Sequence, residues 1–245
     1  MTELASTPET RTAAAEDQSA VTILQVKNVT QNVDLGSNTL TILQGVSLEI
    51  KRGQSVAIVG RSGSGKTTLL GLLAGLDTPS EGDIILEGKT ISGMSEDDRA
   101  ALRARRVGFV FQSFQLLPSL TALENVMLPL ELGGVANPEA RAKELLQRVG
   151  LGERLTHTPR QLSGGEQQRV AIARAFAADP VILFADEPTG NLDNQTGQEI
   201  TELLMTLNRE QGTTLVMVTH DEQLAARCER RLTIEAGHLG AEAGH

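Results

Sequence analysis

Two segments near the start of the chain alternate apolar and polar residues. Leu24–Val29 and Thr39–Ile50 follow this period of two, which predicts antiparallel strands that each leave one face to water. Val56–Val59 is instead a short, wholly apolar run that ends at Gly60, the pattern of a strand buried on both faces. Further strands are expected at Asp83–Glu87 and Val107–Phe111.

Helical patterns dominate the middle of the chain, from about residue 113 to residue 178. Polar residues that cap helices mark the expected helix starts at Ser95, Thr121 and Asn137. Gly150 is expected to end the helix that starts after Asn137. These residues predict a block of helices inserted between strands.

Buried-strand patterns return after Pro180. They occur at Val181–Ala185 and Thr214–Val218, and helical patterns follow them at Gln195–Arg209 and Asp221–Arg227. Buried strands that alternate with helices predict an α/β fold on a mainly parallel sheet, interrupted by the helical insertion.

One domain is expected to account for nearly the whole chain. It spans residues 21–238, with the core and a β subdomain at 21–112 and 179–238 and a helical subdomain at 113–178. The polar, acidic residues 1–20 are expected to form a disordered tail, and residues 239–245 a second tail.

Charge argues against one class of partner. The 245 residues include 22 Lys and Arg against 31 Asp and Glu, so the formal net charge is −9. Because contacts to the phosphates of DNA or RNA need clustered cations, we expect no nucleic-acid partner.

The single cysteine, Cys228, excludes an internal disulfide and is typical of a reducing compartment. No apolar run approaches the ~20 residues of a membrane helix, and the first residues lack the pattern of a secretory signal.

A glycine-rich loop follows the buried strand Val56–Val59. It matches the pattern G-x-x-x-x-G-K-[ST], and the helix Lys66–Ala74 begins at its end. In this pattern backbone N–H groups surround phosphate oxygens, the lysine reaches the terminal phosphates and the hydroxyl binds Mg²⁺. The predicted phosphate-binding residues are Gly60, Arg61, Ser62, Gly63, Ser64, Gly65, Lys66, Thr67 and Thr68.

Two adjacent carboxylates end the strand Val181–Ala185. Successive residues on a strand point to opposite sides, so Asp186 and Glu187 are expected to have different roles. One serves the Mg²⁺ shell, while the other takes a proton from the attacking water. Together with the glycine-rich loop, this pair predicts nucleotide chemistry.

A second helix start contains glycines, far along the chain from the first. Ser163 and Glu166 form a capping box, which by itself explains neither Gly164 nor Gly165. Glycines at a helix start expose backbone N–H groups to an incoming anion. Because one nucleotide cannot easily use both helix starts of a monomer, we expect a dimer. Each nucleotide then lies between the loop of one chain and Leu162–Glu166 of the other.

These motifs, in this order, resemble the ABC ATPase family from about Leu24 to Gly237. The resemblance also rests on Gln112 and His220, each of which follows a predicted strand, and on the run Gly190-Asn191-Leu192-Asp193. It implies a P-loop NTPase (RecA-like) core with an antiparallel β subdomain and an inserted α-helical subdomain. ATP and Mg²⁺ are the cofactors that it implies.

The resemblance further implies roles for the matching residues. Glu187 is the expected general base, and His220 contacts the terminal phosphate. Gln112 senses Mg²⁺ and the attacking water and links the site to a membrane partner. The residues expected at the metal are Thr67, Gln112 and Asp186. Asp193 is expected at the dimer seam. Ser163 and Gly165 are expected to complete the site of the partner chain.

Within the family, two stretches are similar to a bacterial branch that contains lipoprotein-release and macrolide-export ATPases. They are residues 109–118 with 123–126, and Ala185–Asp193. The similarity implies an ATP-hydrolysing subunit that works as a homodimer at the cytoplasmic face of the inner membrane. Its partner is a separate permease with a large extracytoplasmic domain, and the transport expected is export or extraction of a lipophilic or envelope-related substrate.

One position departs from the family pattern. The family places an aromatic residue, which stacks on adenine, near Val33, whereas this chain contains no Tyr or Trp and its Phe residues begin at Phe109. Only apolar packing is therefore expected against the base. Nucleotide affinity then depends on phosphate and Mg²⁺ contacts, which ATP and GTP share.

Three other functions compete with the transporter. A DNA-repair or chromosome ATPase of the same family carries long coiled-coil arms, and no sustained heptad run is present here. A translation-type factor needs two tandem domains and a basic surface. A small-molecule kinase has a phosphate loop but no use for residues 163–165. The transporter ATPase accounts for every motif and is the function that the sequence favours.

Overall fold

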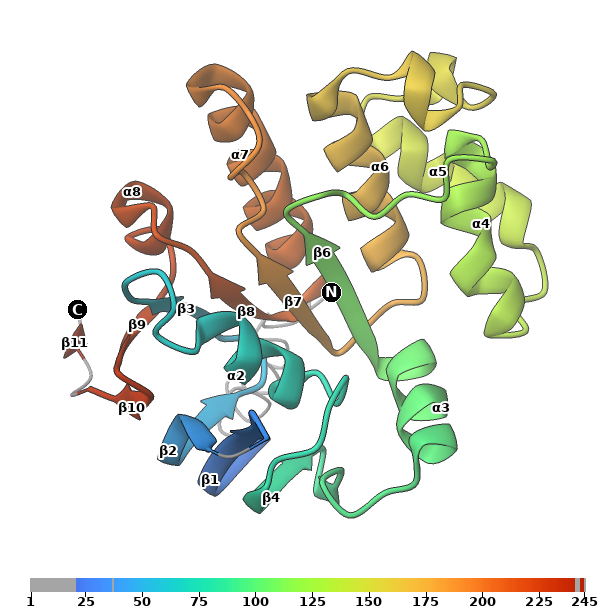
Figure 1. Cartoon of the computed structure of the whole chain (residues 1–245). Coiled ribbons are helices and arrows are strands. Elements are labelled where there is room, and N and C mark those ends of the chain that lie inside the picture. Colours follow the sequence, from blue (N-terminus) through green and yellow to red (C-terminus); the bar gives the residue numbers. More distant parts are fainter. Residues whose placement is uncertain (1–20, 37, 241–242, 245) are drawn as a thin grey trace, which may run out of the picture.

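The computed structural model describes residues 21–36, 38–240 and 243–244. The acidic tail expected at residues 1–20 lies outside them. A four-stranded sheet, a seven-stranded sheet and the helices around them make up the described part of the chain (Figure 1). Within that part, no helix combines the length and the apolar character that crossing a membrane requires.

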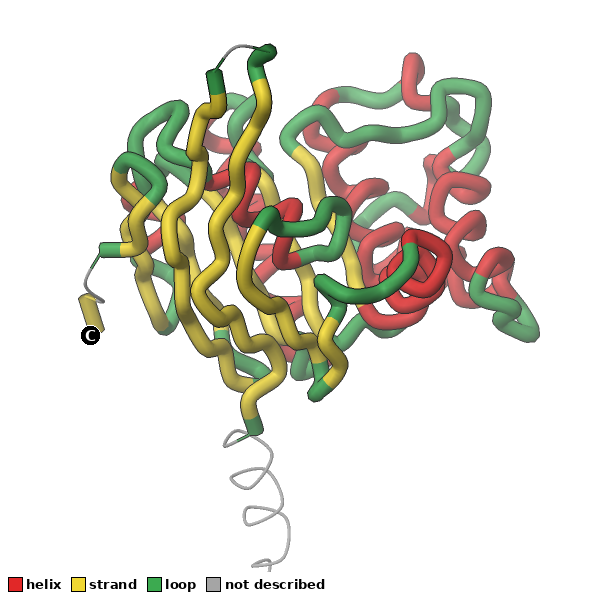
Figure 2. Tube along the Cα trace, turned by 60° about the horizontal axis from the view of Figure 1, so that its bottom comes forward, coloured by secondary structure: helices red, strands yellow, loops and turns green. Residues whose placement is uncertain are grey.

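The smaller sheet is antiparallel, as the alternating segments predict. Its strand order is β2-β1-β4-β5, from β1 (Thr22–Asp34), β2 (Thr39–Lys51), β4 (Glu81–Leu86) and β5 (Lys89–Thr90). In β2, Val46, Leu48 and Ile50 are buried and the residues between them are exposed. Figure 2 shows these long strands side by side across one side of the molecule.

The larger sheet is mainly parallel and has the order β10-β9-β3-β8-β7-β6. Its strands are β3 (Ser55–Val59), β6 (Val107–Phe111), β7 (Ile182–Asp186), β8 (Thr214–Val218), β9 (Arg230–Glu235) and β10 (His238–Leu239). β3, β6, β7 and β8 lie where the apolar runs predict strands. β9 and β10 were not predicted, although Leu232 and Ile234 of β9 are buried and alternate with polar residues.

Strand pairing continues past the domain boundary that was expected after residue 238. Leu239 pairs with Ile234, and β11 (Ala243–Gly244) pairs with Arg230 and Arg231 of β9. The sheet therefore extends into the segment that the sequence predicted as a tail.

Helix α2 (Lys66–Leu73) lies between the two sheets. Its buried residues Leu69 and Leu73 belong to one apolar cluster with Leu24 of β1 and Ile58 of β3. Burial of this kind stabilises a fold by roughly 25 cal/mol for each Å² of apolar surface removed from water. The cluster fixes the helix that begins at the phosphate loop against both sheets.

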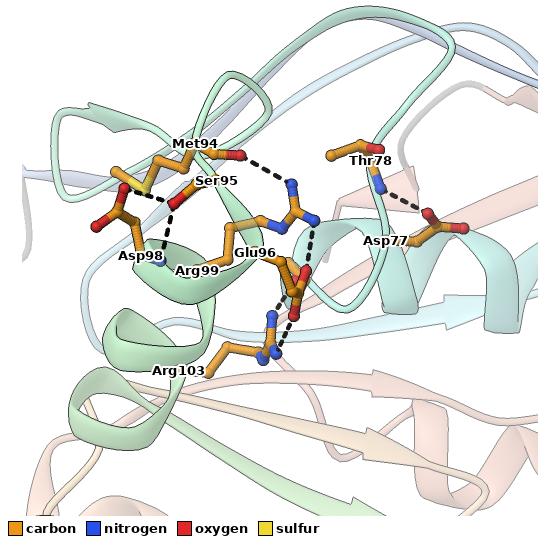
Figure 3. A network of polar contacts seen from close by, with 9 residues as sticks. Asp77, Thr78, Met94, Ser95, Glu96, Asp98, Arg99 and Arg103 are labelled. Atoms are coloured by element: carbon orange, nitrogen blue, oxygen red, sulfur yellow. Dashed lines mark hydrogen bonds and ion pairs between the residues drawn. The ribbon is translucent and has the colours of Figure 1, made fainter.

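Helix α3 (Glu96–Arg106) is joined to the segment after α2 by a hydrogen bond, and none of its residues is buried. Figure 3 shows Glu96 between two arginines, at 2.5 Å from Arg99 Nη2 and 2.7 Å from Arg103 Nη2. Arg103 also donates to the backbone oxygen of Gly75, just after α2. Ser95 caps the helix by accepting from the N–H of Asp98, as predicted.

The predicted helical insertion is present between β6 and β7. It contains α4 (Ala122–Leu132), α5 (Pro138–Arg148), two short 3₁₀ helices (Gly152–Arg154 and Pro159–Gln161) and α6 (Gly164–Phe176). Thr121 and Asn137 are the N-cap residues of α4 and α5, in agreement with the sequence. Two more helices follow β7 and β8, namely α7 (Asn194–Gln211) and α8 (Glu222–Ala225).

The parallel sheet is apolar on both faces. Val56 and Ile58 of β3 belong to the cluster around α2, whereas Ala57 and Val59 belong to a second cluster with residues of α4, α5, α6 and α7. Successive strand residues point to opposite faces, which explains why wholly apolar runs were required. The sheet is thus the layer that joins the two cores.

Candidate functional site

The carboxyl ends of four parallel strands meet at one edge of the sheet. Register pairs Phe111 of β6 with Asp186 of β7, and Asp186 and Ile58 each with Val218 of β8. Gly60, Gln112 and Glu187 follow directly after the ends of β3, β6 and β7, and His220 lies two residues after the end of β8. Ligands of open α/β sheets bind at this edge, so the fold places the glycine-rich loop and the acidic pair where a nucleotide site is expected.

The glycine-rich loop runs from β3 to the start of α2. Gly63 and Gly65 have φ angles of 76° and 101°, a left-handed conformation that glycine adopts without strain. The Nζ of Lys66 donates to the backbone oxygens of Gly60 and Arg61 at 2.8 and 3.0 Å. These bonds place the ammonium group within the loop, close to where backbone N–H groups and the helix N-terminus favour anions.

Asp186 and Glu187 have different partners, as their positions on a strand predicted. The Thr67 hydroxyl lies 3.4 Å from Oδ1 of Asp186, which joins the loop to the end of β7. The pKa of Asp186 is raised above its usual value, mainly because burial disfavours the charged carboxylate. The hydrogen bond from Thr67 opposes this shift, and the negative charge of Glu187 adds to it. The hydroxyl of Thr67, at the end of the phosphate loop, and the carboxylate of Asp186, at the end of β7, therefore lie side by side.

Glu187 lies beside His220. Its Oε1 is 2.9 Å from Nδ1 of His220, and its Oε2 accepts from the His220 backbone N–H at 3.4 Å. The Glu187 side chain is only 15% exposed, against 73% for His220. Glu187 has a φ of 46°, a left-handed conformation that costs a residue with a side chain about 1–3 kcal/mol. The fold therefore holds this carboxylate in a strained, well-defined position.

The loop residues other than the buried Ser64 line one cavity of about 790 Å³ together with Glu187 and His220. Leu40 and Ile42 of β2 form an apolar part of its wall. An anion cradle, an apolar wall and a carboxylate–imidazole pair meet here, which fits a nucleoside triphosphate and an attacking water. Gln112 and Asp186 do not line this cavity. Asp186 is hydrogen-bonded to Thr67, which lines the cavity, and the side chain of Gln112 donates to Asn191.

The second predicted anion site lies at the start of α6, and Leu162–Glu166 does not line the cavity. Ser163 is the N-cap of α6, and its capping box with Glu166 is formed in both directions. Hydrogen bonding from the Ser163 backbone is the main cause of a lowered pKa at Glu166, and the Arg154 side chain contributes to it. Gly164 and Gly165 occupy the first two helical positions, whose N–H groups have no acceptor within a helix.

Packing supplies a further reason for Gly165 that the sequence did not reveal. A Cβ at this position would lie 2.6 Å from Cγ2 of Thr196, at the start of α7. Asp193 is the N-cap of the same helix and accepts from the Thr196 N–H and hydroxyl at 3.0 and 2.6 Å. Asp193, which was expected at the dimer seam, therefore also has a structural role in its own chain.

Comparison with known sequences decides the family. The family model for ABC transporters matches residues 43–190. The chain belongs to the ABC transporter family. This ABC ATPase is 58% identical to the uncharacterized ABC transporter ATP-binding protein YbbA of Escherichia coli K12, over 91% of this chain and 99% of that protein.

Relatives with named transport systems are also similar to this ABC ATPase. The lipoprotein-releasing system ATP-binding protein LolD of Pseudomonas syringae is 51% identical over 89% of this chain and 96% of its own length. The macrolide export ATP-binding/permease protein MacB of Syntrophobacter fumaroxidans is 46% identical, over 91% of this chain but 32% of its own length. The branch that the sequence resembled is therefore confirmed.

A solved structure confirms the fold of the ABC ATPase. The ATP-binding cassette MJ0796, in a dimeric post-hydrolysis state with ADP and Pi, matches with a TM-score of 0.84 and 42% identity, over 91% of this chain and 98% of that one. The expected P-loop NTPase core, with its antiparallel and helical subdomains, is thus correct.

Some residues around the site of the ABC ATPase were not singled out from the sequence. Leu40 and Ile42 line the cavity, and Val33, which was expected at the base, pairs with Leu40 in the antiparallel register but does not line it. Gln168 and Arg174 of α6 were also missed. An apolar residue in an alternating strand or a polar one inside a helix has no sequence signal that separates a site role from packing.

Helix α6 of the ABC ATPase contacts two loops of the site through those residues. The Nε2 of buried Gln168 donates to the backbone oxygen of Pro188 at 2.5 Å, directly after Glu187. Arg174 donates to the backbone oxygens of Phe114 and Gln115 at 2.9 and 2.6 Å, and burial lowers its pKa. One helix therefore carries the glycine-containing start and holds both neighbouring loops.

Proposed function

We propose that this ABC ATPase hydrolyses ATP with Glu187 as the general base. The observation that carries the proposal is the cavity in which Lys66, Glu187 and His220 meet. A carboxylate oxygen of Glu187 takes a proton from water as the water oxygen bonds to the terminal phosphorus. The bond from this phosphorus to the bridging oxygen breaks, and ADP leaves with the electron pair. Lys66 and the loop N–H groups stabilise the phosphate charge, and His220 orients Glu187.

The residues next to the loop fit Mg²⁺. The donors that converge here are the hydroxyl of Thr67 and the carboxylate of Asp186, both hard oxygen ligands. The described residues contain no group of three or more His, Cys, Asp or Glu that could hold a metal by themselves. Mg²⁺ in nucleotide sites is held by few protein ligands together with the phosphates. Bound there, Mg²⁺ neutralises charge on the phosphates, and Gln112 is the third residue that we assign to its neighbourhood.

We propose a homodimer with two composite sites. The start of α6 carries N–H groups without acceptors in the helix, yet it lies outside the cavity of its own chain. A second copy of the chain can bring Ser163, Gly164 and Gly165 to the terminal phosphate from the opposite side. The dimeric state of the cassette MJ0796 supports this arrangement.

The proposed partner of the dimer is a separate permease with a large extracytoplasmic domain. The proposed location is the cytoplasmic face of the inner membrane, where the dimer powers export or extraction of a lipophilic or envelope-related substrate. The similarity to LolD and MacB supports this proposal. Copurification with a membrane protein from detergent-solubilised membranes tests this proposal. A chain that brings down DNA-repair proteins or ribosomes instead would reject the transporter.

The segment after Gln112 offers a contact surface for that permease. Leu116 packs against the apolar cluster of the helical subdomain, whereas the Leu117 side chain is 44% exposed. Buried Asn125 holds the Leu117 backbone with hydrogen bonds of 2.8 Å to its N–H and 3.2 Å to its oxygen. The backbone is therefore fixed by the fold, and the exposed leucine is presented outward.

Leu117→Asp is expected to abolish copurification with the permease while the melting temperature and ATP-dependent dimerisation stay at the parent values. A charge on an apolar contact surface opposes docking of a permease helix, but it disturbs no core. Leu116→Asp should lower the melting temperature, and Leu132→Asp, at another exposed leucine, should change neither property. Unchanged copurification of Leu117→Asp would show that the permease binds elsewhere.

ATP and GTP are expected to bind with dissociation constants within about tenfold of each other, or about 1.4 kcal/mol. The wall at the base is aliphatic, from Leu40 and Ile42, so it offers no ring and no hydrogen bond to distinguish the bases. Val33→Tyr should tighten binding of both nucleotides, because its ring can extend the wall beside Leu40. The control is Leu35→Tyr, at an exposed leucine outside the cavity. A parent that prefers ATP by about a hundredfold, with no response to Val33→Tyr, would show that another group reads the base.

A further inference from the structure

The side-chain amide of Gln112 lies on the turn that follows Glu187. Its Nε2 donates to Oδ1 of Asn191 at 3.2 Å, and Nδ2 of Asn191 donates to the backbone oxygen of Gln112 at 3.0 Å. Both residues are exposed, and 79 positions separate them in the sequence. The two hydrogen bonds join the end of β6 to the connection between β7 and α7.

Gly190, in this turn, has no side chain and so leaves room for the Gln112 amide. A Cβ at Gly190 would lie 2.8 Å from Nε2 and 3.2 Å from Cδ of Gln112, so any side chain there would displace the amide. The Gly190 N–H donates to the backbone oxygen of Glu187 at 3.0 Å. The surface on which Gln112 rests is therefore tied directly to the residue assigned as the base.

Asn191 determines where the amide of Gln112 lies. Among the residues that the structure describes, Asn191 is the one hydrogen-bond partner of this amide. An exposed glutamine without a partner samples several rotamers, and holding it in one of them lowers its conformational entropy. Because the second bond holds the Gln112 backbone, Asn191 constrains the residue at two points.

We propose that Asn191 is a positioning residue for ATP hydrolysis. It fixes Gln112 relative to the turn that begins at Glu187, so that the amide and the base keep one geometry during the chemical step. The assignment rests on the hydrolysis proposed above and goes beyond it, because Asn191 acts through Gln112. Asn191 does not line the cavity around the phosphate loop, and loss of this side chain is therefore expected to affect turnover rather than nucleotide affinity.

The test is a double-mutant cycle in the full-length chain, with kcat and KM for ATP and the melting temperature as readouts. Asn191→Ala is expected to lower kcat about tenfold, a change of about 1.4 kcal/mol, while KM and the melting temperature stay at the parent values. In a Gln112→Ala background the same change should alter kcat by less than about twofold, because the group through which Asn191 acts is already gone. Gln195→Ala removes another exposed amide near the same turn and should leave kcat unchanged.

Two outcomes would overturn the assignment. The first is a kcat for Asn191→Ala within about twofold of the parent. The second is full additivity, in which Asn191→Ala lowers kcat as much in the Gln112→Ala background as in the parent. If Glu187→Gln nevertheless abolishes turnover, the proposed function stands and only the role of Asn191 is rejected.

Discussion

Glu187→Gln is expected to bind ATP and to accumulate as a dimer, while its turnover falls by about 10²–10⁴. The amide keeps the size of the carboxylate: its oxygen can still accept from the His220 backbone N–H, and its NH2 group can donate to Nδ1 of His220, which lies 2.9 Å away. It cannot accept the proton of the attacking water. The left-handed backbone at this position, with a φ of 46°, is as accessible to Gln as to Glu, so the site geometry is preserved.

The measurement is phosphate release at saturating ATP, together with size-exclusion chromatography with and without ATP. Glu229→Gln, the same chemical change at an exposed glutamate outside the cavity, is the control and should hydrolyse ATP at the parent rate. A Glu187→Gln protein that hydrolyses ATP within about threefold of the parent would show that Glu187 is not the base.

Lys66→Ala and Ser163→Arg are expected to fail at different steps. Lys66→Ala removes the ammonium group from the loop of its own chain and should lose nucleotide binding. Ser163→Arg leaves that loop intact and should bind ATP, but it blocks a surface that only the partner's nucleotide needs. It should therefore neither dimerise nor hydrolyse ATP. Fluorescent-nucleotide titration and light scattering separate the two defects, and a Ser163→Arg protein that hydrolyses ATP as a monomer at the parent rate would reject the composite site.

The structure calls for a control on Ser163→Arg, because Ser163 also caps α6. Loss of an N-cap costs about 0.5–2 kcal/mol of stability. Thr121→Arg removes the same kind of capping box from α4 and is the matched variant. It should lower the melting temperature by a similar amount and still dimerise and hydrolyse ATP. Loss of dimerisation in both variants would attribute the effect to stability.

The fold could be predicted from the sequence wherever one local pattern determines an element. The apolar runs of β3 and β7 have the short length that favours strands buried on both faces, and the capping boxes at Thr121 and Ser163 begin α4 and α6 where expected. β9 was not predicted, and its place in the sheet depends on pairing with β3, a distant segment.

The candidate site could be predicted to the level of motifs but not of side-chain partners. The loop, Glu187 and His220 line one cavity as the motifs predicted. The contact of Gln112 with Asn191 could not be foreseen, because it depends on how two loops approach each other across the sheet edge.

Tertiary packing also determines the surroundings of single residues, which the sequence pattern does not reveal. A Cβ at Gly165 would meet Thr196, so this glycine has a structural reason that local sequence does not show. Leu116 and Leu117 are adjacent and equally apolar, yet one packs against the core and the other is exposed. Sequence pattern cannot separate such neighbours in an irregular segment, where no period relates one side chain to the next.

The most direct test of the composite site is the activity of Lys66→Ala and Ser163→Arg mixed in equal amounts. Each heterodimer has one site that pairs the intact loop of the Ser163→Arg chain with the intact α6 start of the Lys66→Ala chain. Neither variant is active alone, so turnover in the mixture can come only from these hybrid sites, and we expect turnover to appear on mixing and to stay below the parent rate. No turnover in any mixture in which heterodimers are shown to form would contradict two independently competent composite sites.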